Sequence, residues 1–218
     1  MKTVVDNDLI LKSVSYGLAD VFWPDGEPHS IGILGAAKYV VGHEIARAGL
    51  KRGADVARSE LSDFLGRCAE LEPNDEEIEL AAQIELCGQE HGLALDNGES
   101  QLAALVVMRD LPLLETGDKR AIAGLDGARP HLEALDHLRG RIRCLEQIAR
   151  QVIEEDETFG SVSAGVCAEA AVDKSLSICF GCYADSPADR ATVIEALDQY
   201  VREVRRSAPE MLLDDGQG

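Results

Sequence analysis

Four carboxylates in this sequence have the positions that a metal-dependent hydrolase requires. Asp6 and Asp118 each end a short apolar run, and such runs are typical of buried strands. Glu44 and Glu99 each fall in the first turn of an expected helix, where the helix dipole favours an anion. Carboxylate oxygens suit Mg²⁺ and Mn²⁺, and these ions activate water and stabilise charge at phosphorus. We therefore expect the acids to converge on one divalent-cation site.

Short strands and helices must carry these carboxylates to one place. We predict strands at residues 3–5, 38–41 and 112–115. We predict helices directly after residue 6 and at residues 42–50, 54–70, 99–110 and 119–125. Another helix begins after Asn74, which forms a capping box with Glu77. This alternation indicates an α/β fold with a parallel sheet, and acids that follow parallel strands meet at one edge of the sheet.

The sequence after residue 127 has a different pattern. The segment at residues 127–130, GARP, marks the best boundary, and a long helix is predicted at residues 131–155. Residues 160–184 are small and apolar, and the choice between helix and strand stays open there. A final helix is predicted to start at Ser186-Pro187-Ala188-Asp189, with Ser186 as its cap. The expected organisation is a first domain at 1–127, a mainly helical extension at 128–213 and a disordered tail at 214–218.

The overall charge limits the partners of this chain. Its formal net charge of −19 opposes broad, non-specific binding to a phosphate backbone. It does not exclude a nuclease, because a bound cation reverses the field of the carboxylates that hold it. A basic partner protein and simple solubility both fit the acidity. No apolar run is long enough to span a membrane and no signal peptide is recognisable, so we expect a cytoplasmic protein.

The six cysteines are expected to be reduced thiols in that compartment. Cys68, Cys87 and Cys144 fall on apolar helical faces and are predicted to be core residues. Cys179 and Cys182 form a lone CxxC, for which zinc would need two more ligands and a redox role a thioredoxin-like context. We interpret this pair as structural thiols, with a metal or redox role as the alternative.

Three motifs in the first part of the chain each join an acid to an apolar run. VVDNDLIL at residues 4–11 is similar to the opening strand and helix of PIN domains, a family of nucleases in which an Asp follows a hydrophobic strand. GESQLAAL at residues 98–105 is similar to their later helix start, with Glu as the third acid. LLETGDKRA at residues 113–121 is similar to their closing motif, a strand that ends in Thr-x-Asp. The resemblance covers about residues 1–127, and the order of the motifs fits as well.

The PIN resemblance implies a three-layer α/β/α sandwich that cleaves RNA with Mg²⁺ or Mn²⁺. Many members of the family are toxins that a partner antitoxin neutralises. The resemblance implies that Asp6, Glu99 and Asp118 are metal ligands, and that Glu44 takes the place of the second family acid. Thr116 would orient Asp118 or a bound water.

Other residues near these acids are expected to support the site or contact RNA. Asp8 and Asp96 are expected behind the ligands, and Lys119 and Arg120 are candidates for phosphate contacts. The C-terminal helices would form a homodimer, dock a regulatory partner or cap the cleft.

Each acid also has an ordinary explanation, as a helix cap or as a first-turn acid that complements a helix dipole. Two other functions fit parts of the sequence. Asp6-Asn7-Asp8 after a strand resembles the start of haloacid dehalogenase phosphatases, in which Asp6 would be the nucleophile and Asp8 a general acid. The Gly-Thr pair usual after that motif is replaced by Leu9-Ile10. The third hypothesis is a non-catalytic interaction module that has kept the PIN fold.

Overall fold

A parallel five-stranded sheet forms the centre of the part of the chain that the computed structural model describes, residues 2–24, 29–154, 156–186 and 188–214. The strand order is β3-β2-β1-β4-β5, and every neighbouring pair is parallel. The strands are β1 (Thr3–Val5), β2 (Ile31–Leu34), β3 (Ala69–Leu71), β4 (Leu114–Thr116) and β5 (Ile142–Cys144).

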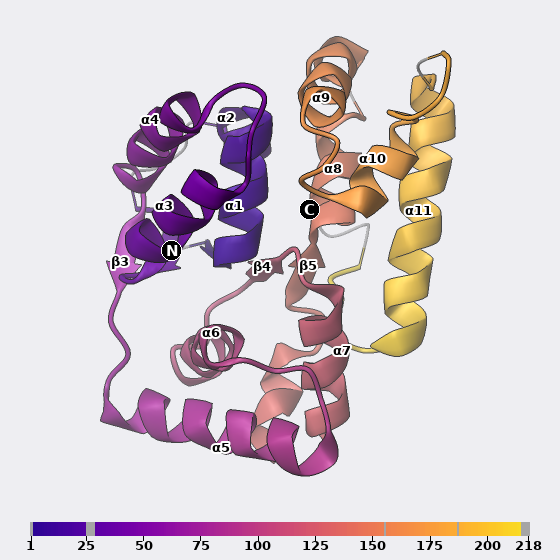
Figure 1. Ribbon diagram of the computed structural model, residues 1–218. Helices are drawn as coiled ribbons and strands as arrows, with labels where there is room; N and C mark the ends of the chain where they lie inside the picture. The colour runs from indigo at the N-terminus through magenta and orange to yellow at the C-terminus, as the bar shows by residue number, and fades with distance from the viewer. Residues whose placement is uncertain (1, 25–28, 155, 187, 215–218) are drawn as a thin grey trace.

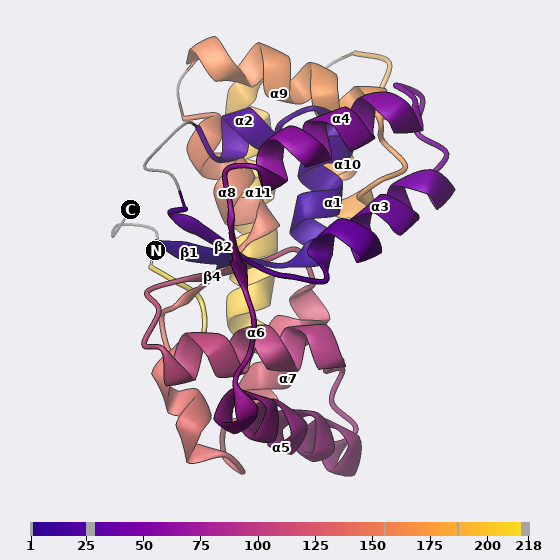
Figure 2. The same cartoon turned by 90° about the vertical axis from the view of Figure 1, so that its left-hand side faces the viewer.

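Helices cover both faces of this sheet (Figure 1). In Figure 2 one layer above the sheet contains α1 (Asn7–Tyr16), α2 (Ala19–Phe22), α3 (Ala37–Arg47), α4 (Ala54–Leu65), α8 (Leu145–Val152) and α9 (Asp156–Ala168). The layer below contains α5 (Asp75–His91), α6 (Asn97–Met108) and α7 (Lys119–Ala128). The remaining elements are the 3-10 helix η1 (Glu133–Leu138), α10 (Lys174–Cys179) and the long α11 (Arg190–Ser207). No helix of the described residues has the length and apolar character that crossing a membrane requires.

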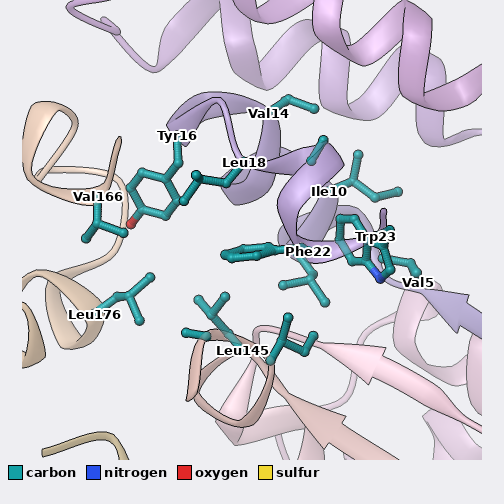
Figure 3. Close-up of a cluster of buried hydrophobic side chains, with 14 of the residues drawn as sticks. Val5, Ile10, Val14, Tyr16, Leu18, Phe22, Trp23, Leu145, Val166 and Leu176 are labelled. Atoms are coloured by element: carbon teal, nitrogen blue, oxygen red, sulfur yellow. The ribbon is translucent and has the colours of Figure 1, made fainter. Parts of the chain in front are cut away.

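The two helical layers bury separate apolar cores. Successive residues of a strand point to opposite faces, so Val5 joins the core above the sheet and Val4 joins the core below it. In the upper core, Tyr16 of α1 lies beside Val166 of α9 and Leu176 of α10 (Figure 3). The beginning and the end of the chain therefore share one core.

Local signals placed several elements correctly. The strand at residues 3–5 is confirmed, and α1 follows it and ends where Gly17 adopts a left-handed conformation with φ 74°. The capping box of α5 is also confirmed: Asn74 accepts a hydrogen bond from the Glu77 N–H, and Glu77 accepts one from the Asn74 N–H. Such caps use neighbours in sequence, which is why they can be predicted without tertiary contacts.

The prediction for residues 31–50 was wrong in its order. The strand is β2, at the start of this segment, and one helix, α3, replaces both the strand predicted at residues 38–41 and the helix predicted to open at Gly42. Tyr39 and Val40 are exposed, at 72 % and 44 %, whereas Ile33 and Leu34 are buried. Both runs are apolar, and burial rather than periodicity decides which one joins the sheet. The helix predicted at residues 54–70 likewise ends early, at Leu65, and its last residues form β3.

The long helix predicted at residues 131–155 was also wrong. This segment contains η1, then β5, then α8. Gly140 has φ +66° and separates η1 from β5, in which Ile142 and Cys144 are buried. Because β5 pairs with β4, the sheet includes a strand from beyond the boundary expected at residue 127.

The C-terminal part is helical, and it differs in two details from the sequence predictions. Helix α11 begins at Arg190 with Asp189 as its N-cap, one turn later than the start predicted from Ser186; Pro187 lies outside the described residues. Cys167 and Cys182 form a disulfide, which corrects the expectation of reduced thiols, whereas Cys179 is a free and buried thiol. Of the tail expected at 214–218, residues 215–218 lie outside the description, and Asp214 pairs with Arg205 at 3.3 Å.

Candidate functional site

The predicted acids lie at the edge of the sheet where parallel strands end. Asp6 directly follows β1, and Gly117 and Asp118 follow its neighbour β4. From the central strand β1, the next two strands of the chain, β2 and β3, lie on one side of the sheet, and the last two, β4 and β5, lie on the other. Ligands of open α/β sheets bind at such a reversal of strand order, because the two connections leave in opposite directions and open a crevice.

A cleft of about 320 Å³ opens at this reversal. All four predicted carboxylates line it, and Asp8 and Asp96 line it as well. We call it the acidic cleft; its described lining is Asp6, Asn7, Asp8, Leu11, Val40, Val41, Glu44, Asp96, Gly98, Glu99 and Asp118. The sheet edge, α3 and the start of α6 therefore each contribute side chains to one cleft.

Asp6 forms the buried end of the acidic cleft, with 8 % of its surface exposed. Its Oδ2 accepts a hydrogen bond from the Thr116 hydroxyl at 2.9 Å, and that hydroxyl oxygen accepts one from the Asp118 N–H at 3.1 Å. The Thr116 hydroxyl thus positions the carboxylate of Asp6, whereas it contacts Asp118 at the backbone N–H and not at the carboxylate. Burial, reinforced by the charge of Asp8, raises the pKa of Asp6 to about 6.

Glu99 enters the acidic cleft from the first turn of α6. Its Oε2 accepts a hydrogen bond from the Asp96 N–H at 2.9 Å, and Asp96 Oδ1 accepts one from the Glu99 N–H at 2.9 Å. The pair is a capping box, so the structural explanation of Glu99 holds beside any functional one. Burial raises the pKa of Glu99 to about 7, and the charges of Asp96, Asp118 and Asp6 act in the same direction.

Asp118 caps α7 and is neutralised from the same helix. It accepts hydrogen bonds from the Arg120 N–H at 2.7 Å and from the Arg120 guanidinium at 2.8 Å. Partial burial alone would raise its pKa, but the hydrogen bonds and charge of Arg120 hold the pKa of Asp118 below its ordinary value.

Glu44 reaches the acidic cleft from a position other than the one predicted. It lies in the second half of α3 instead of in a first turn, so the helix dipole does not favour its charge there. Its side chain is 47 % exposed and lies 3.5 Å from His43 and 3.8 Å from Arg47. Glu44 therefore forms the outer, solvated rim of the cleft.

The donor set of the acidic cleft fits a hard divalent cation. Its charged groups are carboxylates, and the pKa values of Asp6 and Glu99 are raised, which a cation would reverse. As they stand, however, no three His, Cys, Asp or Glu side chains of the described residues lie close enough to hold an ion together. Glu99 and Asp118 are turned instead towards the N–H groups that they cap.

A second cleft adjoins the first and contains bases. It has a volume of about 340 Å³, and we call it the mixed cleft; its described lining is Asp8, Lys12, Gly117, Asp118, Lys119, Arg120, Asp173 and Ser175. The Lys12 ammonium lies 2.7 Å from Asp8 and 2.9 Å from Asp173. Lys119 pairs with Glu146 and donates to the Ser175 hydroxyl at 3.1 Å. Both expected phosphate contacts, Lys119 and Arg120, therefore line this cleft in ion-paired form.

Sequence reasoning missed three of the charged residues in and beneath the mixed cleft. Lys12 had a usable signal, since it stands four residues after Asp8 on a helix, a spacing that brings the two side chains together. Asp173 and Glu146 carried none, because they reach the cleft from segments whose elements were undecided or wrongly predicted.

Comparison of the chain with protein-family models, with curated proteins and with solved structures finds no match. A function for this protein therefore has to be assigned from the chemistry and geometry of its clefts.

Proposed function

We propose that the acidic cleft is the active site of a Mg²⁺- or Mn²⁺-dependent nuclease of the PIN kind that hydrolyses phosphodiester bonds in RNA. The observation that carries this proposal is the convergence of Asp6, Glu44, Glu99 and Asp118 on one cleft at the reversal of strand order. These acids come from four separate elements, so their meeting is not a consequence of local capping.

The raised pKa values of the two inner acids support the proposal. Burial, together with the charge of neighbouring carboxylates, opposes the ionisation of Asp6 and Glu99, and a bound cation offsets that cost. Asp6, Glu99 and Asp118 would hold the ion, while Glu44 at the rim would contact it or its bound water. When bound, the ion supplies a Lewis acid and an activated water for attack at phosphorus.

The hydrogen bonds of the cleft are compatible with metal ligation. Asp6 bonds to Thr116 through Oδ2, so its Oδ1 can ligate while Thr116 keeps the carboxylate in place. Glu99 accepts the Asp96 N–H through Oε2 in the capping box of α6, and Oε1 can ligate in the same way. Asp118 would have to release the guanidinium of Arg120, whose side chain is 81 % exposed and free to turn outward.

The PIN resemblance extends the proposal to regulation. We propose a toxin-like enzyme in the cytoplasm that a partner protein restrains, with the C-terminal helices available for a partner or a second copy. The two clefts remain the basis of the chemistry whichever of these assemblies forms.

Two alternatives differ in how they use the same residues. The phosphatase hypothesis requires Asp8 to act as a general acid on a substrate, but its carboxylate is engaged in an ion pair with the Lys12 ammonium at 2.7 Å. The interaction-module hypothesis is favoured by a specific observation, because Glu99 completes the capping box of α6 and Asp118 caps α7, so both have structural roles. It predicts that the cleft has no metal affinity.

Calorimetry with Mn²⁺ and a cleavage assay separate these functions. The wild type, the Asp6→Asn, Asp118→Asn double variant and an Asp55→Asn control would each be titrated and then assayed on pooled RNA and single-stranded DNA. Asp55 suits the control because its side chain is 99 % exposed on α4. Binding and RNA cleavage that vanish only in the double variant support the nuclease. Absence of Mn²⁺ binding by the wild type would overturn it in favour of the interaction module.

A further inference from the structure

The mixed cleft gathers three bases around one open space beside the acidic cleft. Lys12 belongs to α1, Lys119 and Arg120 belong to the start of α7, and Ser175 of α10 adds a hydroxyl. Figure 2 shows α1, α3 and α10 on the side of the molecule towards which β1 runs. Ammonium, guanidinium and hydroxyl groups are the donors that proteins use for phosphate oxygens.

The single positive charge of Lys12 is paired with two carboxylates. Its side chain is only 11 % exposed, and it contacts the carboxylates of both Asp8 and Asp173. A buried ammonium needs one counter-charge, and Asp8 supplies it from the same helix. Asp173 arrives from a distant segment as a second anion, so it lies where an external anion could bind Lys12.

Asp173 is held at this place by contacts of its own. It caps α10 by accepting a hydrogen bond from the Leu176 N–H at 2.8 Å. The disulfide between Cys167 and Cys182 closes the segment that carries it. The position of Asp173 therefore does not depend on Lys12 alone.

A side chain at Gly117 would disturb the ion pair at the floor of the mixed cleft. A Cβ atom there would lie 2.3 Å from Asp8 Oδ2 and 3.1 Å from Lys12 Nζ, so the Asp8 carboxylate would have to shift. The Gly117 carbonyl also accepts a hydrogen bond from Lys12 at 3.5 Å. The backbone thus leaves room for the ammonium to face the open space.

We propose that the mixed cleft binds a phosphate group of the nucleic-acid substrate through Lys12, Lys119 and Arg120. Asp173 is an internal competitor that occupies Lys12 when the phosphate is absent. The assignment to a nucleic acid rests on the proposed nuclease function. Asp8 and Asp118 line both clefts, so a chain that is cut in the acidic cleft continues into the mixed cleft.

The charge balance of the cleft explains why Asp173 matters. The described lining contains three bases and three acids, Asp8, Asp118 and Asp173, so the wild-type cleft has no excess of positive charge. Replacing Asp173 with Asn removes one acid and keeps the cap of α10, because Asn is as good an N-cap as Asp. That single change therefore removes the contact that competes for Lys12 and keeps the hydrogen bond that caps α10.

Inorganic phosphate, titrated into the metal-free full-length chain by calorimetry, tests the site directly. The variants are Asp173→Asn, the same variant with Lys12→Gln, and Asp189→Asn as the matched control. Asp189 is also an N-cap aspartate, on α11, and it does not line the cleft. We expect Asp173→Asn to bind phosphate on the order of tenfold more tightly than the wild type and Asp189→Asn. Adding Lys12→Gln should abolish that gain.

Two results would overturn the inference. One is equal phosphate affinity in Asp173→Asn and Asp189→Asn; the other is a gain that survives Lys12→Gln in a variant with an unchanged circular dichroism spectrum. Either result, obtained with a wild type that binds Mn²⁺ and cleaves RNA, leaves the proposed nuclease function intact.

A kinetic readout distinguishes a phosphate of the RNA chain from a free phosphate ion. If the RNA backbone occupies the cleft, Asp173→Asn lowers KM for RNA and changes kcat little. A tenfold gain for inorganic phosphate with an unchanged KM for RNA would overturn the nucleic-acid assignment and leave a site for a free phosphate ion.

Discussion

The two clefts share Asp8 and Asp118, yet bases accompany the acids only in the described lining of the mixed cleft. In the mixed cleft the bases face carboxylates: Lys12 lies between two of them, Lys119 pairs with Glu146 and Arg120 pairs with Asp118. The described lining of the acidic cleft contains no base, and its two inner acids have raised pKa values.

This difference separates charges that are paired with one another inside the protein from charges of one sign that are gathered without a counter-charge in the cleft lining. A buried pair that loses one partner leaves an uncompensated charge, so its removal destabilises the fold. Removing an acid from a crowded acidic site relieves repulsion instead, which is the behaviour expected of a ligand site built at a cost in stability. Substitutions in the two clefts should therefore change stability in opposite directions.

The largest expected effect is the loss of Lys119 from the mixed cleft. Lys119→Met leaves the carboxylate of Glu146, which is 1 % exposed, without its partner. We expect the free energy of unfolding to fall by about 3–5 kcal/mol in urea denaturation. Lys119→Met combined with Glu146→Leu should recover most of this loss. Failure of the double variant to recover would mean that Lys119 acts through its cation–π contact with the Tyr200 ring and not through the pair with Glu146.

The next effect concerns the segment that carries Asp173. The Cys167–Cys182 disulfide closes a loop with a sequence separation of 15, and a loop of this length is stabilised by roughly 3 kcal/mol. The Cys167→Ala, Cys182→Ala double variant should lose about that much free energy of unfolding. Reducing agent should lower the thermal midpoint of the wild type towards that of the variant. If the thermal midpoint of the wild type does not change with reductant, the segment is fixed by its other contacts.

In the acidic cleft, removing a charged group should raise the free energy of unfolding instead of lowering it. The pKa of Asp6 is about 6 in the folded chain and 3.8 ordinarily. A folded pKa above the unfolded one contributes stability at low pH that is lost as the pH rises through the folded value. Without metal, Asp6→Asn should therefore be more stable than the wild type by about 3 kcal/mol at pH 8.

The pH dependence of that gain identifies its cause. The difference between Asp6→Asn and the wild type should open between about pH 4 and pH 6 and stay constant above. Asp55→Asn should show no such difference. A gain that is independent of pH would assign the effect to packing and contradict the charge comparison.

The smallest effect is expected at the rim. Glu44→Gln removes a carboxylate that is 47 % exposed and already close to His43 and Arg47. Stability should change by less than about 0.5 kcal/mol, and Mn²⁺ affinity should fall by less than about tenfold. A loss of affinity as large as that of Asp6→Asn would place Glu44 among the direct ligands.

The sequence revealed the acids better than it revealed their surroundings. Asp6 and Asp118 follow strands and Glu99 starts a helix, so local patterns were enough to place them at one sheet edge. The capping boxes at Asn74 and Asp96 depend on a spacing of three residues, and one of them was predicted for that reason.

Partners that are distant in sequence could not be found in this way. Asp173 contacts Lys12, and Glu146 contacts Lys119, only because α8 and α10 pack against the upper core. The prediction of a single helix over residues 131–155 hid β5, since η1, β5 and α8 each bury apolar residues at spacings that imitate a helix. Such contacts depend on tertiary packing, and the spacing of apolar residues along the sequence gives no information about that packing.

The proposed metal site is tested by Mn²⁺ calorimetry of the wild type beside the Asp6→Asn, Asp118→Asn variant, in two pH 7 buffers of different ionisation enthalpy. We predict that the wild type binds Mn²⁺ with release of protons, because Asp6 and Glu99 have pKa values of about 6 and about 7 and must ionise to ligate. We predict no binding by the variant. A wild type that binds no Mn²⁺, or binds it equally well after both substitutions, would contradict the metal site.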